Sequence, residues 1–297
     1  MDHPPDGGRR IRKDNVKEPS IKKRILYDRL FKTIVVLLTF CSILPMFFIL
    51  FFITSKGISA INWRFLTQLP KPVGERGGGI SNAIIGTLML IGIGTAFSVP
   101  VGILAGIFFS ENRKGKLASL TRLCVETLQG VPSIVIGIIA YIWLVVSMGS
   151  FSALSGGVAL GLMMLPVIIT ATEQTLKLIP GSLKEASLAL GVSYPRTILK
   201  VILPAGVSGI ATGILLSIAR VAGETAPLLF TAFGSPFINL NILKPINSLP
   251  LMIFNYATSP YPEWHTLAWG ASFVLIILVL GLNLFTKVVT KRWKVQF

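Results

Sequence analysis

Long uncharged stretches dominate the chain. A hydrocarbon core of about 30 Å needs about 20 mostly apolar residues in a helix. Stretches of about this length or more lie between Lys32 and Lys56, Arg76 and Glu111, Glu126 and Glu173, Lys200 and Arg220, and Glu263 and Lys287. The third encloses 46 residues, enough for two helices, and apolar character after the fourth resumes beyond Glu224. The pattern therefore predicts six transmembrane helices.

The predicted fold class is all-α, a polytopic bundle of six transmembrane helices. We expect these helices at about residues 33–55, 80–109, 125–147, 153–172, 204–231 and 265–287. Residues 1–32 then form a basic segment, residues 33–297 form the transmembrane domain, and residues 173–203 form a long loop between the fourth and fifth helices. Buried helices of a soluble protein are the alternative, but six runs of this length argue against it.

The basic residues are sorted along the chain. There are 28 Lys and Arg residues against 12 Asp and Glu, for a formal net charge of +16. With six helices, 22 of the basic residues lie on the side that holds both termini and residues 110–124 and 173–203, and five lie on the other. The positive-inside rule places the richer side in the cytoplasm, so residues 56–79 and 232–264 face outward. The charge is thus a topology signal in a lipid bilayer and gives no support for nucleic-acid binding.

Signatures of catalysis are missing from the sequence. The two cysteines, Cys41 and Cys124, lie in or beside apolar runs, and the two histidines are His3 and His265. This set offers no metal site, and neither a P-loop nor a serine nucleophile elbow is present. We expect a chain that is not an enzyme, binds no cofactor or metal, and depends on another subunit for any energy.

The 173–203 loop contains helix signals of its own. Ser182 and Glu185 have the spacing of a capping box, and Gly191 can end a helix in the left-handed conformation. A short helix over about residues 183–190 is expected, with Leu203-Pro204 restarting the chain as the fifth transmembrane helix. Its small residues suit docking against another protein, although a well-formed connector explains the pattern equally well.

The same loop carries a family resemblance. Glu185-Ala186-Ser187, then Gly191, and Val201 ahead of Leu203-Pro204 have the spacing EAA-x3-G-x9-I-x-LP, with Ser187 and Val201 as mild departures. This resembles the EAA loop of ABC-importer permeases, which implies the type I (MetI-like) permease fold. It also implies a coupling helix that enters a cleft of a cytosolic ATPase, with the following residues involved: Ser182, Glu185, Ala186, Ser187, Gly191, Leu203 and Pro204.

Further segments narrow the resemblance to the PstA-type permeases of phosphate importers. They are residues 77–88, 130–135, 219–229 and 264–270. The resemblance implies a related permease as heterodimer partner (PstC-like), two ATPase copies (PstB-like) that bind ATP and Mg, an external phosphate-binding protein (PstS-like), and a multi-pass location in the bacterial inner membrane. Composition and spacing alone do not select phosphate. A permease for sulfate or molybdate and a proton-coupled carrier remain alternatives.

Two charged residues interrupt the fifth predicted helix. Arg220 and Glu224 are four residues apart, so on one helix they would share a face and could form an ion pair. A buried guanidinium there could bind two oxygens of an oxyanion while Glu224 holds it, or the pair could only stabilise the helix or a partner contact. Gln129 and Ser133, at one-turn spacing in the third helix, are further candidates for the substrate path.

Overall fold

The computed structural model describes residues 21–75, 77–112 and 115–292, so residues 1–20 of the predicted basic segment lie outside the described part. Four of the described helices are long and apolar enough to cross a membrane, and two bent helix pairs raise this number to six if each pair is one span. These six regions correspond to the six predicted helices. The part of the chain that the structure describes holds no strands, only two isolated bridges. The all-α fold class is confirmed.

The chain divides into two compact units, residues 1–52 and 53–297, which are described separately. The first consists, in its described part, of residues 21–52 of α1, and this helix begins at Ile21, earlier than predicted. The helices are α1 Ile21–Gly57, α2 Trp63–Thr67, α3 Ser81–Glu111, α4 Lys116–Gly130, α5 Ser133–Ala140, α6 Val146–Met148, α7 Ala153–Lys177, α8 Gly181–Ala189, α9 Tyr194–Thr197, α10 Leu203–Ala205, α11 Val207–Val221, α12 Ala226–Thr231, α13 Leu249–Ala257 and α14 Pro262–Arg292. A 3-10 turn spans Ile58–Ala60, and π-helical segments span Tyr141–Val145 and Ile198–Ile202.

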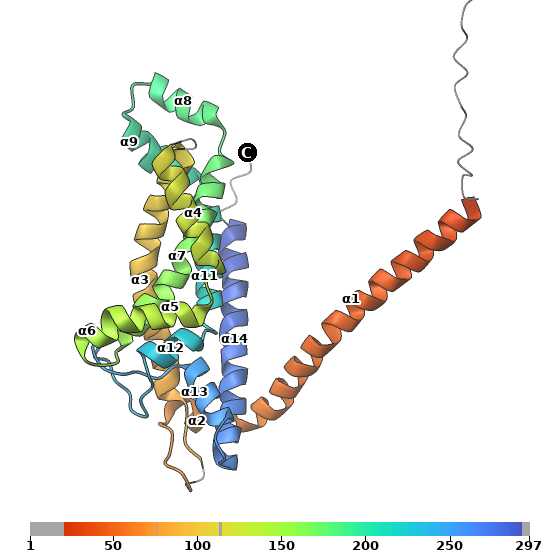
Figure 1. The fold of residues 1–297 in the computed structure, drawn as a ribbon, viewed down its shortest axis with the longest axis vertical. Coiled ribbons are helices and arrows are strands. Elements are labelled where there is room, and N and C mark those ends of the chain that lie inside the picture. Colours follow the sequence, from red (N-terminus) through yellow and green to blue (C-terminus); the bar gives the residue numbers. More distant parts are fainter. Residues whose placement is uncertain (1–20, 76, 113–114, 293–297) are drawn as a thin grey trace, which may run out of the picture. The chain divides into compact units, whose positions relative to one another are not determined.

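Helix α7 forms the centre of the second unit, with α3 and α11 packed against it (Figure 1). Small residues allow this close packing: a Cβ on Gly102 of α3 would lie 2.7 Å from Cγ2 of Ile168, and one on Gly213 of α11 would overlap the Cβ of Ala171. Such positions let helix backbones approach closely where lipid provides no hydrophobic drive between helices. The largest apolar cluster lies between α3, α5, α7, α11 and α12.

The third predicted helix, residues 125–147, is not one helix. Helix α4 begins earlier, at Lys116, and ends at Gly130; the chain then turns by 109° into α5. Proline disfavours the helical conformation in the residue before it. Val131, which precedes Pro132, is accordingly extended, with φ −70° and ψ 128°.

The fifth predicted helix, residues 204–231, is also interrupted. Helix α11 ends at Val221, and α12 starts at Ala226 with Pro227 in its first turn. The restart at Leu203-Pro204 is wrong as well, because these residues lie inside a helical run from Tyr194 to Ala205, and the bend of 68° comes at Gly206. Pro227 suits the start of α12, because a proline in the first turn of a helix lacks only an N–H that would have no partner within the helix.

Apart from the breaks after α4 and α11, the longer described connections of residues 53–297 lie at two ends of the unit. Residues 112, 115–116 and 178–206 lie at the end that carries α8 and α9, and residues 58–75, 77–80 and 232–262 lie at the end that carries α2 and α13 (Figure 1). This separation agrees with the predicted sorting of loops. The α2 end has its own apolar cluster, built around Phe65, Leu249 and Leu267.

Candidate functional site

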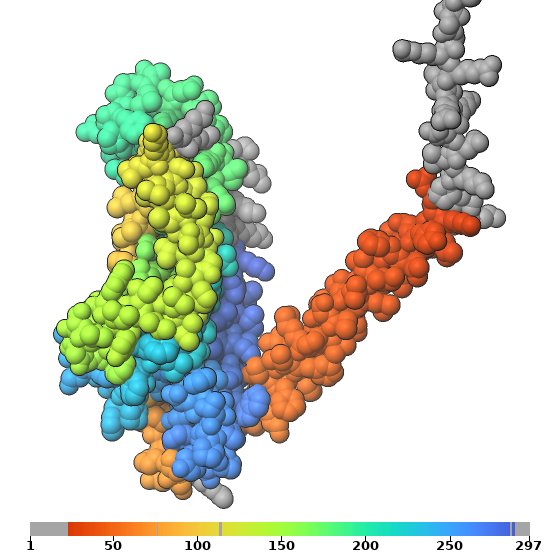
Figure 2. All heavy atoms as spheres, in the orientation of Figure 1, coloured from red at the N-terminus to blue at the C-terminus, as the bar shows by residue number. Residues whose placement is uncertain are grey.

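The two interrupted helices lie against each other. Helix α5 contacts α12, and a Cβ on Gly137 of α5 would lie 2.6 Å from the Cα of Pro227 in α12. We call residues 129–133 and 220–225, where α4 and α11 end, the elbow region. Helices α4 and α5 lie at the surface in the middle of the face seen in Figure 2, with α12 beside α5. Interrupted helices beside a ligand route are a common way for transporters to offer backbone and side-chain groups to a substrate.

Arg220 and Gln129 meet in the elbow region. Both side chains are exposed, and both line a recess of about 10 Å³, which has room for about one water molecule. Gln129 donates hydrogen bonds from Nε2 to Thr170 Oγ1 (3.1 Å) and to the Pro166 carbonyl (3.4 Å) on α7. The structure therefore brings two of the four predicted path residues together on an open face.

The predicted Arg220–Glu224 pair is not formed. Glu224 lies beyond the end of α11, and its backbone N–H bonds to the Val221 carbonyl, so the two side chains do not share a helix face. Among the described residues, the ion pairs do not include this one. Ser133 is the first residue of α5 and is partly buried, but it does not line the recess of Arg220.

The short helix of the 173–203 loop is present as α8. Gly191 has φ +77°, and its N–H bonds to the Leu188 carbonyl (2.9 Å) while Val192 N–H bonds to the Ser187 carbonyl (3.3 Å). These two bonds form a Schellman motif, as expected for a glycine stop. The predicted capping box is wrong, because the helix begins at Gly181 after Pro180 and Ser182 makes no capping bond.

Residues of the EAA pattern divide between the surface and the interior. Glu185, Ala186 and Gly191 are exposed, and Leu190 beside them is 84% exposed. Ser187 is buried, and its hydroxyl shares a 3.0 Å hydrogen bond with that of Thr197 on α9. Leu203 is partly buried in the apolar cluster beneath α8, and Pro204 is exposed. The pattern thus provides an exposed surface and the bonds that hold it in place.

Sequence reasoning missed two polar clusters at the α8 end. Glu173, 7% exposed in α7, pairs with Arg122 of α4 and with Lys177, both at 2.6 Å. Glu111, the last residue of α3, pairs with Lys184 of α8 and accepts a hydrogen bond from Tyr194 of α9. Only the Glu173–Lys177 spacing of four residues was readable from the sequence.

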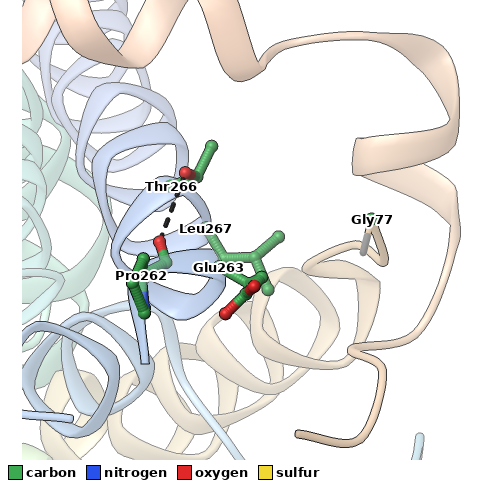
Figure 3. A pocket seen from close by; sticks show the side chains of 5 residues that line it. All are labelled: Gly77, Pro262, Glu263, Thr266 and Leu267. Carbon is green, nitrogen blue, oxygen red and sulfur yellow. Dashed lines mark hydrogen bonds between the residues drawn. The ribbon is translucent and has the colours of Figure 1, made fainter. Parts of the chain in front are cut away.

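A pocket at the α2 end is unsuited to an anion. It has a volume of about 320 Å³, and Figure 3 shows Glu263 with Pro262, Thr266 and Leu267 of α14 on one side and Gly77 on the other. Among the described residues that line this pocket, the charged side chain is the carboxylate of Glu263. This carboxylate would repel an oxyanion, so this pocket is a poorer candidate for the substrate path than the elbow region with Arg220.

The fold of this chain recurs in solved structures. The chain superposes on a structure with the description "Inward facing conformations of the MetNI methionine ABC transporter" with a TM-score of 0.62, covering 72% of this chain and 96% of that one at 21% identity. At this identity the match shows the fold alone. The architecture is that of an ABC-importer permease.

Sequence relatives identify the family. Residues 98–295 match the family described as binding-protein-dependent transport system inner membrane component. The phosphate transport system permease protein PstA of Yersinia pestis is 44% identical over 83% of this chain and 84% of its own length. The probable phosphate transport system permease protein PstA of Methanocaldococcus jannaschii is 40% identical over 87% of this chain and 92% of its own. The chain belongs to the PstA family of binding-protein-dependent transport permeases.

Proposed function

We propose that this chain is the phosphate-translocating permease subunit of an ATP-driven importer, and that the anion passes the elbow region beside Arg220. The observation that carries the proposal is the exposed guanidinium at the end of α11, next to Gln129, in a chain whose close relatives are phosphate transport permeases. A guanidinium can donate two parallel hydrogen bonds to a tetrahedral oxyanion.

The recess at Arg220 is too small for phosphate. Because the guanidinium is exposed on one face, a second protein surface has to complete the route around the anion. A related permease, PstC-like, would supply that surface in a heterodimer. Alternating access then means that the two permeases open the elbow region first to one side of the membrane and then to the other.

Energy for this cycle would come from a separate subunit. The exposed surface of α8, with Glu185 and Ala186, would contact one of two PstB-like ATPases, which hold ATP and Mg. A PstS-like protein would deliver phosphate at the α2 end, and the α8 end would face the cytoplasm with both termini. In this arrangement the chain itself catalyses no reaction, and it lies in the inner membrane.

Uptake of radiolabelled phosphate by the reconstituted importer tests the function. We expect uptake that requires ATP and the external binding protein, and that excess sulfate or molybdate does not inhibit. Inhibition by either of these anions would identify a permease for another oxyanion. Uptake that follows a pH gradient without ATP would instead identify a proton-coupled carrier.

A further inference from the structure

Three helices meet at the carboxylate of Glu111. Lys184 of α8 and Tyr194 of α9 both donate hydrogen bonds to Oε2 of Glu111 at the end of α3. The Lys184 ammonium also lies 4.8 Å from the centre of the Tyr194 ring, as in a cation–π contact. The side chains of Lys184 and Glu111 are 29% and 21% exposed, so water screens this cluster only in part.

Glu111 lies at a position where a carboxylate benefits from a positively charged neighbour. The carboxyl end of a helix carries a partial negative charge, which repels a carboxylate in the last turn. Lys184 offsets this repulsion. Although partial burial of Lys184 acts to lower its pKa, the hydrogen bonds and charge interactions with Glu111 and then with Tyr194 outweigh this and raise the pKa above its ordinary value. Lys184 is therefore charged at neutral pH, and the pair stays intact.

Below α8 the packing is incomplete. A cavity of about 230 Å³ separates part of α8 from the ends of α3 and α7. Its lining residues are Ser110, Glu111, Leu176, Ile179, Pro180, Gly181, Lys184 and Ile202. Leu183 packs on the neighbouring apolar cluster, and the Ser187–Thr197 bond joins α8 to α9 rather than to the bundle. The Glu111 cluster thus spans the cavity and ties α8 and α9 together to α3.

Helix α3 extends this connection toward the elbow region. A Cβ on Gly106 of α3 would lie 2.5 Å from the Cβ of Thr172 in α7, so the backbones of α3 and α7 approach each other closely there. The next residue of α7, Glu173, is bound to Arg122 of α4, and α4 ends at the elbow. A displacement of α8 can therefore reach the end of α4 through two ion pairs and one tight helix contact.

We propose that Glu111 is a positioning residue that fixes α8 to α3, so that movements which ATP imposes on α8 reach the elbow region. The proposal rests on the proposed function, because it assigns a role to Glu111 within that transport cycle. Loss of the tie should leave ATP hydrolysis in place while less phosphate moves for each ATP.

The test compares phosphate uptake and ATP hydrolysis in the reconstituted importer, with the amount of intact complex measured alongside. For Glu111→Gln and Lys184→Met, we expect the ratio of phosphate to ATP to fall by about fivefold or more, the lower end of typical couplings between sites. The exposed Lys71–Glu75 pair, 3.5 Å apart in the loop at the α2 end, supplies the controls Glu75→Gln and Lys71→Met, which should keep the ratio.

A charge exchange separates positioning from simple loss of structure. Glu111→Lys should lower the ratio, and adding Lys184→Glu should restore it in part, because the pair re-forms with its charges reversed. An unchanged ratio in Glu111→Gln, or a lowered ratio that the exchange does not restore, would overturn the inference while wild-type uptake still supports the proposed function. A wild-type complex that hydrolyses ATP without taking up phosphate would contradict both.

Discussion

Arg220 is the residue on which the proposed transport chemistry depends, and the structure changes how its charge is accommodated. The guanidinium is not neutralised by Glu224; it lies in the last turn of α11, where the helix dipole favours a cation, and it is exposed beside Gln129. Since no carboxylate of the described residues forms an ion pair with Arg220, an arriving anion can bind its donors directly.

Substitutions at Arg220 and Glu224 test this arrangement. Arg220→Gln should lower phosphate uptake by about ten- to hundredfold, as expected for lost hydrogen bonds between charged groups, and Arg220→Lys should recover only part of it. Adding Glu224→Gln to Arg220→Gln should give no rescue, because the two side chains are not paired. The measurement is phosphate uptake normalised to intact complex in the membrane.

Rescue in that double variant would mean that the two charges balance each other during the cycle, and the substrate-path role of Arg220 would be refuted. Unchanged uptake in Arg220→Gln alone would refute it as well. Arg196→Gln, an exposed arginine in α9, serves as a matched loss of charge away from the elbow region.

Individual residues differ in how well the sequence predicts them. The stop at Gly191 is predictable because a left-handed glycine after a short helix is a local device. The cap at Ser182 is not, because Pro180-Gly181 starts the helix first. Glu111 and Lys184 are 73 residues apart, and their contact depends on how α3 and α8 pack, which no local pattern contains.

At the level of elements, helix positions are more predictable than helix continuity. Apolar length reveals each membrane-crossing region, since water is excluded from the whole span. It does not reveal that α4 and α5 meet at 109°, because the uncharged stretch that starts after Glu126 continues through the bend into α5. Pro132 and Pro227 can be read from the sequence. A proline inside an apolar run can bend a helix, end it or leave it intact, however, and the packing around the proline decides which of these occurs.

Packing between α7 and α11 leads to a stability prediction. Gly213→Ala should lower the free energy of unfolding by about 1–3 kcal/mol, because the new Cβ would overlap Ala171. Gly92→Ala in α3 is the matched control: no atom lies within 4 Å of a Cβ there, so the change should be neutral or should stabilise the helix by up to about 1 kcal/mol. Denaturant unfolding of the purified protein in detergent gives both values.

Equal stability changes in the two alanine variants would show that α11 does not pack on α7 through Gly213. The comparison is informative because both glycines lie inside helices, so the helix propensity gained is the same and only the space differs.

At the level of the whole molecule, the sorting of loops to two ends was predictable from charge and helix count, because insertion follows basic residues. The α13 helix was not predicted, since it lies in a segment that was assigned to an outer loop. Likewise, the pairing of α5 with α12 could not be predicted, because it joins regions about 90 residues apart that become neighbours only in the folded bundle.

Thiol labelling tests which end faces the cytoplasm. After replacement of Cys41 and Cys124, an impermeant reagent should label Asn241→Cys in whole cells and label Leu190→Cys only after permeabilisation. Leu190 is 84% exposed, whereas Ser187 is buried and would be a poor probe. Labelling of Leu190→Cys in intact cells would reverse the proposed orientation.

The most direct test of the account is labelling of a cysteine in the elbow region itself. Gly130, the last residue of α4, is exposed, and no atom lies within 4 Å of an added Cβ, so Gly130→Cys should preserve uptake. If phosphate passes this region by alternating access, the labelling rate of Gly130→Cys in the full importer will differ between the nucleotide-free and ATP-trapped states, and phosphate will slow it. One labelling rate in both states, unaffected by phosphate in a complex that still transports it, would contradict the account.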